Sequence, residues 1–498
     1  MTDVEADTVI VGSGVSGVLV ARELARRGQT VLILERGASV PWREQQRTER
    51  WEAHTPGAEH NHEVDPAGRD WPWQYVYGLG GTLNRWGATS PRLLPEDFEM
   101  RSRYGVMRDW PFGYDELAPY YRAAEEALAI TGARSELMPG PAPPLPPHGF
   151  STQDRLVAAH LEPFIPLRQA RPSRATGGVN ACCGSFSCQL CPVDAKATVL
   201  NRLGPVLRAP GVRVLDRTIA ASLESDAAGR RVEAVACVRE DGQRFRARGR
   251  RFVVAANGIE SAGLLLRSGI GGGDTGRYLF DHRNAQLLVP TRRQVRPGVG
   301  ESLITGASYA YYSGEHRRTR AGALLLPYNP GPPNVPVYQA LVDGILAGRR
   351  GPELRASATD EWKRTVALDV YVDDVPDAGN AVRLSSRRDR YGIPLNRVRF
   401  GDPSPYFERA VRHLLEDVPR RLRPVGARDA RFAFTMAGGH LLGTLRMGTE
   451  DDAVVDPDLR HRRRENLFVA GGAVFPTYSP SHPTLTIAAL AIRLGRRL

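Results

Sequence analysis

The chain has 498 residues, of which 42% are hydrophobic, and carries a formal net charge of +12. This length exceeds what one hydrophobic core usually organises, so we expect two closely packed domains. The positive charge comes from scattered arginines without a long basic tract or interleaved aromatic residues, which argues against a nucleic-acid partner. No apolar run approaches the ~18 residues of a membrane helix, and the acidic start has no leader pattern. We expect a cytoplasmic protein without an integral membrane segment.

A strand–turn–helix–strand pattern opens the chain. The β-branched run at residues 8–11 predicts a strand, and the following GSGVSG has the GxGxxG spacing. In such a turn the first glycine permits the bend, the second lets the backbone approach a pyrophosphate, and the third lets helix and strand pack closely. A helix to residue 27 and a strand at 31–34 follow, and the acid after that strand suits ribose hydroxyls. We predict a dinucleotide site made by Gly12, Ser13, Gly14, Gly17 and Glu35.

Glu35 also indicates which dinucleotide is bound. A carboxylate at the ribose position argues against the 2′-phosphate of NADP, although Arg36 follows it. The motif lies close to the first residue, as is usual in FAD proteins whose first strand belongs to the flavin domain. The sequence therefore predicts FAD.

Three less specific segments follow. His54, His60 and His62 lie in a polar stretch that we interpret as a loop, although their spacing could also serve a metal ion. The proline-rich segment 138–149 predicts a stiff connector. Alternating apolar and polar residues over 210–256 predict a β-meander.

Four of the five cysteines lie close together in the stretch NACCGSFSCQLCP. The C-C-x4-C-x2-C spacing makes a compact set of soft ligands for an iron–sulphur cluster or for zinc. A disulfide between the adjacent Cys182 and Cys183 would be strained, and the cytoplasm disfavours structural disulfides. Cysteines with a structural role, reduced or disulfide-linked, and cysteines that only pack are the other interpretations.

Several longer blocks occur in a fixed order: YVYGLGGTLNRWGATSPRL, WPFGYDELAPYYRAAEEAL, VVAANGIESAGLLLRSGI, GGHLLGTLRMGT and ENLFVAGGAVFPTYSPSHPTLTIAALAIRLG. Together they resemble the glucose–methanol–choline (GMC) oxidoreductases, flavoenzymes that oxidise alcohols. The resemblance runs from Asp7 to the C-terminus with a divergent middle. It implies a mixed α/β fold, in which a Rossmann-like FAD-binding domain is joined to a discontinuous substrate-binding domain with an antiparallel sheet. The implied FAD-binding pieces are residues 1–100, 175–285 and 430–498, and the substrate-binding pieces are 101–174 and 286–429.

The first of these blocks resembles the family segment that runs beside the flavin. Its Gly80–Thr82 turn has a bare backbone that can approach the flavin phosphates, and the resemblance places Asn84 and Trp86 near the cofactor. Some relatives carry a histidine here that bonds covalently to the flavin. Arg85 takes that position in this chain, so we predict non-covalent FAD. The predicted contacts are Gly81, Thr82 and Asn84.

The C-terminal block resembles the segment that meets the flavin from the other side. A buried strand ends at the glycines 471–472, and a helix begins near Thr484. In the family this helix start faces the flavin, where the positive end of its dipole favours the anionic reduced form. The predicted contacts are Gly472, Ala473 and Thr484.

The resemblance assigns the catalytic pair to His440 and His482. Alcohol oxidation needs one group that takes the hydroxyl proton and another that orients the developing alkoxide, while a hydride leaves for flavin N5. A neutral imidazole suits both roles. We favour His440 as the base and His482 as its partner, and we interpret His282 as structural.

The resemblance therefore predicts an FAD-dependent dehydrogenase that oxidises a CH–OH group of a sugar, glycoside or aminocyclitol-like polyol. Some sugar dehydrogenases of the family carry a similar cysteine run that binds a [3Fe–4S] cluster, which implies a cluster on Cys182, Cys183, Cys188 and Cys191 and an electron-acceptor protein or quinone as partner. The alternatives are an oxidase that makes hydrogen peroxide, a flavin-bound lyase, and a binding protein that kept the fold.

Overall fold

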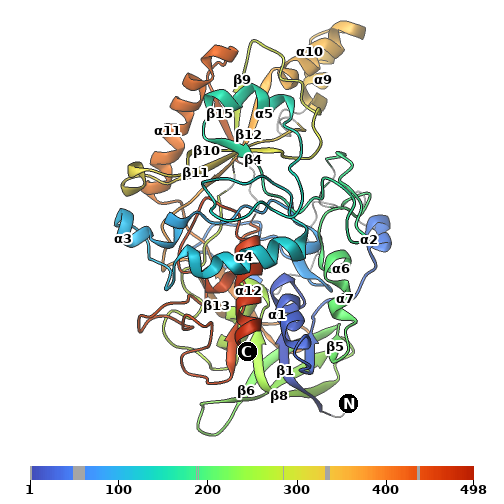
Figure 1. Ribbon diagram of the computed structural model, residues 1–498, viewed down its shortest axis with the longest axis vertical. Helices are drawn as coiled ribbons and strands as arrows, with labels where there is room; N and C mark the ends of the chain where they lie inside the picture. Colours follow the sequence, from blue (N-terminus) through green and yellow to red (C-terminus); the bar gives the residue numbers. More distant parts are fainter. Residues whose placement is uncertain are drawn as a thin grey trace.

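Two large β-sheets lie toward opposite ends of the molecule's long axis (Figure 1). They belong to a computed structural model that describes residues 3–48, 62–186, 188, 190–283, 285–330, 337–434 and 438–498. Both chain termini lie at the end formed by the first sheet. The mixed α/β fold class predicted from the sequence is confirmed, with a Rossmann-like sheet at one end and an antiparallel sheet at the other.

The first sheet has seven strands and is parallel in its nucleotide-binding part. Parallel pairing joins β1 to β2 and β8, β2 to β5, and β8 to β16, whereas β6, β7 and β8 pair antiparallel. The strands are β1 (Val4–Val11), β2 (Val31–Leu34), β5 (Val212–Leu215), β6 (Thr218–Ser225), β7 (Val232–Arg239), β8 (Arg244–Val254) and β16 (Leu467–Val469). The predicted meander is confirmed for β6–β8 but wrong for β5, which lies at the other edge beside β2. Alternation of polarity identifies a half-exposed strand without identifying its partner.

The carboxyl ends of the parallel strands create the site. Val11, Val254 and Val469 are in register at the ends of β1, β8 and β16, so the loops that follow them begin at one edge of the sheet. Ligands of open parallel sheets bind at this edge. Helix α1 (Val15–Ala25) starts directly after the first of these loops and packs against the C-terminal helix α12 (Thr484–Arg497).

The second sheet has six strands, all antiparallel, in the order β15-β9-β12-β11-β10-β4. They are β4 (Phe164–Pro166), β9 (Ala285–Pro290), β10 (Gly306–Tyr311), β11 (Ala323–Pro327), β12 (Thr365–Val372) and β15 (Arg431–Phe434). Helices α5 (Thr152–Val157), α9 (Val337–Leu346), α10 (Gly351–Lys363) and α11 (Pro405–Arg421) lie around it (Figure 1). The pairing places β15 in this sheet, although the expected boundary at residue 430 assigns it to the flavin domain.

A small third sheet joins β3 (His62–Val64), β13 (Ala381–Arg388) and β14 (Pro394–Arg399) beside helix α8 (Asn257–Arg267). His62 therefore lies in a strand, where its Nδ1 is 2.8 Å from the Tyr75 hydroxyl, and not in the predicted loop. His54 and His60 lie outside the described residues. The remaining helices are α2 (Trp42–Thr48), α3 (Met100–Tyr104), α4 (Tyr114–Leu128), α6 (Val199–Arg202) and α7 (Gly204–Leu207).

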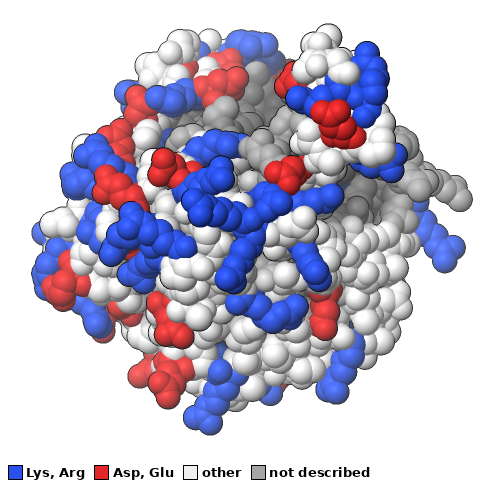
Figure 2. Space-filling model, turned by 90° about the horizontal axis from the view of Figure 1, so that it is seen from above, with Lys and Arg blue, Asp and Glu red and all other residues white. Residues whose placement is uncertain are grey.

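Figure 2 shows the end of the molecule formed by the six-stranded sheet. Basic side chains gather across the middle of this face, with acidic side chains among and around them. Within the described residues, no helix combines the length and apolarity needed to cross a bilayer.

Candidate active site

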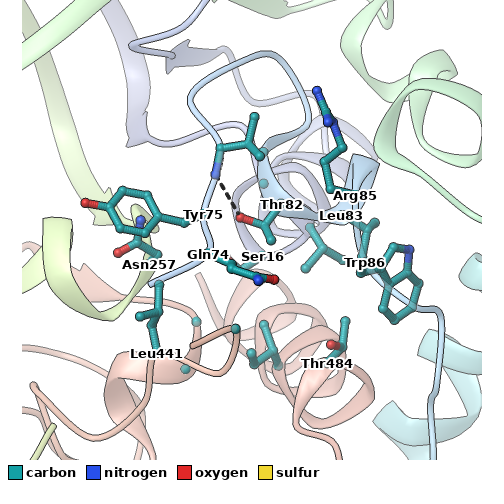
Figure 3. Close-up of a pocket in the computed structure, with 18 of the residues that line it drawn as sticks. Ser16, Gln74, Tyr75, Thr82, Leu83, Arg85, Trp86, Asn257, Leu441 and Thr484 are labelled. Carbon is teal, nitrogen blue, oxygen red and sulfur yellow. Dashed lines mark hydrogen bonds between the residues drawn. The ribbon is translucent and has the colours of Figure 1, made fainter. Parts of the chain in front are cut away.

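One cavity of about 1850 Å³ reaches from the glycine-rich turn of the first sheet to strands of the second. The loop after β1, residues 74–77, 81–83 and 85–89, and the start of α8 line one part of it. Side chains from β12, the segment after β11 and the cysteine stretch line another part. Figure 3 shows this lining around Gln74, Thr82 and Trp86, with Leu441 and Thr484 on the C-terminal elements.

The glycine turn is closely packed at two positions and open at a third. A Cβ on Gly12 would lie 2.5 Å from the Ala255 carbonyl oxygen, and a Cβ on Gly17 would lie 2.1 Å from the Gly12 carbonyl oxygen. A Cβ on Gly14 would meet no atom within 4 Å. The first two glycines thus allow strand, turn and helix to pack, whereas Gly14 keeps a space clear where α1 begins.

The Glu35 carboxylate forms hydrogen bonds to the loops that contain Ser13, Gly37 and Gly78. It accepts hydrogen bonds from the Ser13 hydroxyl at 2.6 Å and from three backbone N–H groups, those of Ser13, Gly37 and Gly78. Burial raises the pKa of this carboxyl, and these donors oppose the shift. The acid predicted to bind ribose therefore also fixes the two loops that border the cavity.

The predicted contacts on the second loop divide into two groups. Gly81 and Thr82 line the cavity, and the Thr82 hydroxyl accepts a hydrogen bond from the Val76 N–H at 3.3 Å (Figure 3). Asn84 lies outside the lining, and its side-chain amide donates to the Leu79 carbonyl at 2.8 Å. Asn84 thus supports the shape of the loop.

The C-terminal contacts divide in the same way. Gly472 and Thr484 line the cavity, whereas Ala473 is buried in a short turn behind it. Thr484 is the first residue of α12, and the Pro483 that precedes it also borders the cavity. Two helices, α1 and α12, therefore present their N-terminal, positive ends to one space.

These features fit a flavin dinucleotide. The open side of Gly14 and the free N–H groups at the start of α1 suit a pyrophosphate. The cavity connects this turn with the second sheet, and its lining combines apolar side chains with many polar and charged ones. The residues that would hold FAD come from the turn 12–16, Glu35, the loop 81–86 and Gly471–Thr484.

Three histidines meet where the two sheets face each other. The ring centroids of His440 and His482 are 5.3 Å apart, and His282 is 4.8 Å from His440. His282 Nδ1 lies 2.7 Å from His440 Nδ1, and His282 Nε2 lies 2.5 Å from the Ser479 carbonyl oxygen. Residues predicted from separate motifs are thus brought together, and His282 joins them.

Burial keeps these imidazoles neutral. Burial lowers the pKa of His282 to about 4. It lowers the pKa of His440 well below the ordinary imidazole value, and the neighbouring His282 and His482 lower it further. Burial also lowers the pKa of His482 well below that value.

Sequence reasoning missed two residues of this cluster. Asp281 accepts hydrogen bonds from the His440 backbone N–H and the Trp71 indole, both at 2.9 Å, and burial raises its pKa to about 8. Tyr371, on β12, packs its ring 3.9 Å from the ring of His482. The adjacency of Asp281 to His282 was a visible signal, but nothing in the sequence around Tyr371 connects it to a distant histidine.

The four cysteines lie in different surroundings. Cys188 lines the cavity and accepts a hydrogen bond from Arg171 Nη1 at 3.3 Å, whereas Cys183 is exposed. Cys182 Sγ is 3.8 Å from the Ser302 hydroxyl, and Cys191 Sγ accepts the Ala195 N–H at 3.2 Å. None of these four cysteines forms a disulfide bond with another described residue. Among the described residues, the set with single-ion spacing is Asp281, His282 and His440, so the thiols are not gathered as a zinc site requires.

A nucleotide turn at one part of a cavity and a histidine cluster at another define a cofactor-dependent oxidoreductase. Comparison with known families gives the particular group. Residues 101–284 and 376–491 match the two parts of the GMC oxidoreductase family, and residues 10–65 match the NAD(P)-binding Rossmann-like domain.

Relatives align along nearly the whole chain. Fructose dehydrogenase large subunit from Gluconobacter japonicus is 30% identical over 98% of this chain and 96% of its own length. 6'''-Hydroxyparomomycin C oxidase from Streptomyces lividus is 31% identical over 99% and 91%, and paromamine 6'-oxidase from Streptomyces fradiae is 30% identical over 98% and 90%. The chain therefore belongs to the GMC oxidoreductase family, as its motifs predicted.

Solved structures agree on the fold. Pyridoxine 4-oxidase from Mesorbium loti superposes with a TM-score of 0.66 at 19% identity over 99% of both chains. An FAD-dependent oxidoreductase from Chaetomium thermophilum gives the same TM-score at 14% identity over 98% of both.

Proposed function

We propose that this GMC oxidoreductase is an FAD-dependent dehydrogenase that oxidises a CH–OH group of a sugar, glycoside or aminocyclitol-like polyol, with His440 as the base. The observation that carries the proposal is the chain of contacts from the Ser479 carbonyl through His282 to His440, at a cavity that also holds the nucleotide turn. The named relatives, which include a fructose dehydrogenase and aminoglycoside oxidases, support the substrate class.

The contacts of His282 determine its tautomer. A carbonyl oxygen only accepts hydrogen bonds, so His282 Nε2 must carry the proton that it shares with Ser479. Because His282 is neutral, its Nδ1 is then a bare acceptor. His440 Nδ1 must therefore donate to it, which leaves His440 Nε2 without a proton. That atom has no hydrogen-bond partner among the described residues and is not sealed from the cavity. His440 Nε2 is thus prepared to accept a proton.

His482 has the opposite preference. Its Nδ1 is buried without a hydrogen-bond partner. A buried N–H without a partner is rarer than a buried acceptor without one, so the neutral ring places its proton on Nε2. His482 Nε2–H then serves as a hydrogen-bond donor toward the cavity. One imidazole accepts and the other donates.

This pair suits the oxidation of an alcohol. As the carbinol C–H bond breaks, His440 Nε2 takes the hydroxyl proton and His482 Nε2–H stabilises the oxygen on which charge develops. FAD, when bound, supplies the acceptor for the hydride. Asp281 fixes the backbone of His440, and Tyr371 holds the ring of His482 in position. The low pKa values keep both rings in the required neutral form at pH 7.

Anaerobic reduction of the flavin by a panel of sugars, glycosides and aminocyclitols tests the proposal. We expect bleaching near 450 nm by at least one polyol, and its loss in both His440→Ala and His482→Ala with retained FAD. If no polyol bleaches the flavin, the substrate class is wrong. If either alanine variant keeps near-wild-type reduction, the paired roles are wrong.

Dehydrogenase and oxidase are separated by a peroxide assay in air with the substrate so found. We favour the dehydrogenase because the cysteine run, if it holds a [3Fe–4S] cluster, would give electrons a route to a protein or quinone acceptor. Iron and acid-labile sulphide, measured on protein purified without oxygen, test that cluster. Their absence, together with stoichiometric peroxide, would establish the oxidase alternative. Non-covalent FAD and the cytoplasmic location remain predictions.

A further inference from the structure

We propose that Asp369 is a substrate-binding residue that selects a polyol carrying an ammonium group. This inference rests on the proposed function, and it narrows the substrate to amino sugars or aminocyclitols. Asp369 lines the cavity that His440 and His482 also line. Asp369 lies on β12, an interior strand of the six-stranded sheet, which positions its side chain.

Asp369 occupies a rigid position opposite the nucleotide-binding sheet. On β12 it lies two residues before Tyr371, so both side chains project from the same face of the strand. Tyr371 contacts the ring of His482. Asp369 is therefore two residues, roughly 7 Å along the strand, from Tyr371, which contacts the histidine cluster.

The neighbouring strands complete a small recess. Gln286 on β9 is the direct cross-strand partner of Asp369, and its side-chain amide donates to Asp369 Oδ1 at 2.7 Å. On the other side, Leu326 of β11 is the direct partner. Tyr328, two residues further, lies diagonally across and lines the same cavity. Two tyrosines and one carboxylate thus border the space.

The carboxylate has no cation to balance it. Within the described residues, Asp369 forms no ion pair, and the Gln286 amide is its hydrogen-bond donor. Burial raises the pKa of this carboxyl to about 7. Arg171, a buried guanidinium in this region, donates to Cys188 instead. A half-buried carboxylate without a positive partner carries a desolvation cost, which a cationic group of a ligand would offset.

The other two carboxylates of the cavity are already engaged. Glu35 accepts four hydrogen bonds from Ser13, Gly37 and Gly78. Glu260 accepts from the Tyr77 hydroxyl at 2.8 Å and the Asn396 amide at 3.2 Å. Glu260 and Asp369 each keep one oxygen, Oε2 and Oδ2, without a hydrogen-bond donor among the described residues. Glu260 lies within the electrostatic reach of Arg36 and Arg267, which line the same cavity, whereas the pKa of Asp369 is shifted by burial and by the Gln286 hydrogen bond, with no arginine acting on it.

An ammonium group matches this recess better than a hydroxyl group does. A charge-assisted N–H···O bond is about twice as strong as a neutral one. An ammonium would also hold Asp369 ionised and could lie against the faces of Tyr328 and Tyr371 through cation–π attraction. A neutral sugar would fill the hydrogen bond but leave the charge unbalanced.

The test compares matched donors in the holoenzyme. The 2-, 3- and 6-amino glucosides are each compared with their N-acetyl and hydroxyl counterparts, and the second-order rate constant of anaerobic flavin reduction is measured at pH 7. We expect one amino glucoside to exceed both counterparts by about 10- to 100-fold. Asp369→Asn keeps the side-chain shape, and it should remove that preference, so that the rate constants for the amino glucoside and its hydroxyl counterpart come within about threefold of each other.

Asp360→Asn is the control, because it removes the same charge from an exposed acid on α10 that pairs with Arg364. It should retain the preference. FAD content and the melting temperature of each variant show whether the fold is kept, and titration of the dithionite-reduced enzyme with the amino glucoside measures binding without turnover. Equal reduction by amino and hydroxyl sugars, or a preference that survives in Asp369→Asn, would overturn this inference and leave the proposed function intact. No reduction by any sugar would overturn both.

Discussion

His282 provides the sharpest test of the catalytic geometry, because its expected role depends on one ring nitrogen. In His282→Phe the ring shape is kept but the acceptor for His440 Nδ1–H is lost. The His440 N–H then faces carbon, and an unsatisfied buried donor costs about 1–3 kcal/mol. The imidazole escapes this cost by moving its proton to Nε2, where it can no longer act as a base.

The expected loss follows from that energy. At 1.36 kcal/mol for each factor of ten, flavin reduction by saturating substrate should slow by about 5- to 150-fold. The dissociation constant of the substrate should change little, since His282 donates to Ser479 and contacts His440 behind the cavity. His282→Asn is the matched variant, because its Oδ1 can occupy the place of Nδ1 and accept the same proton.

Stopped-flow reduction under anaerobic conditions measures both constants, and ¹⁵N spectra of histidine-labelled protein report the tautomer directly. We expect His440 to carry its proton on Nδ1 in the wild type and in His282→Asn, and on Nε2 in His282→Phe. The assignment of His440 as base would be refuted if the asparagine variant slowed as much as the phenylalanine variant, or if the phenylalanine variant stayed within threefold of the wild type.

Three further predictions concern the binding of FAD at the glycine turn, the pH dependence of flavin reduction and the stability that Lys196 contributes. Gly14→Ala should keep the melting temperature of the apoprotein but weaken FAD binding at least about tenfold, because its Cβ enters the open space at the start of α1. Gly17→Ala should lower both the melting temperature and the FAD affinity, because its Cβ would lie 2.1 Å from the Gly12 carbonyl oxygen. Thermal melts and fluorescence titration with FAD compare the two variants. Because the pKa of His440 lies well below its ordinary value of 6.5, the rate of flavin reduction by a neutral polyol should show no step near pH 6.5 and should fall through His440 only at more acidic pH; a rate that halves near pH 6.5 would contradict this. A step near pH 8 would report Asp281, whose pKa burial raises to about 8. Lys196→Met should lower the free energy of unfolding by about 1–3 kcal/mol, because the buried Lys196 ammonium donates to the Asn84 and Trp86 carbonyls, both at 3.0 Å. Urea unfolding measures this change, and an unchanged midpoint of the unfolding curve would show that these hydrogen bonds contribute little.

The sequence by itself determined the parts of the protein that are local in the chain. Gly12, Gly14 and Gly17 act within one turn, and Glu35 ends the next strand, so spacing alone defines the nucleotide end of the cavity. The order of the motifs along the chain also identified the family and predicted His440 and His482 as its catalytic pair. In each case the physical requirement is met by residues close in sequence or by a pattern that a whole family shares.

Only the tertiary structure decided how the distant residues work together. The tautomer of His440 depends on a carbonyl 197 positions from His282, and a main-chain group leaves no trace in the sequence. Asp369 sits in an ordinary alternating strand, and its meaning comes from the cross-strand Gln286 and from a cavity that two sheets enclose. These groups are brought together by strand pairing and not by composition, because the backbone hydrogen bonds that pair two strands do not depend on which side chains the strands carry.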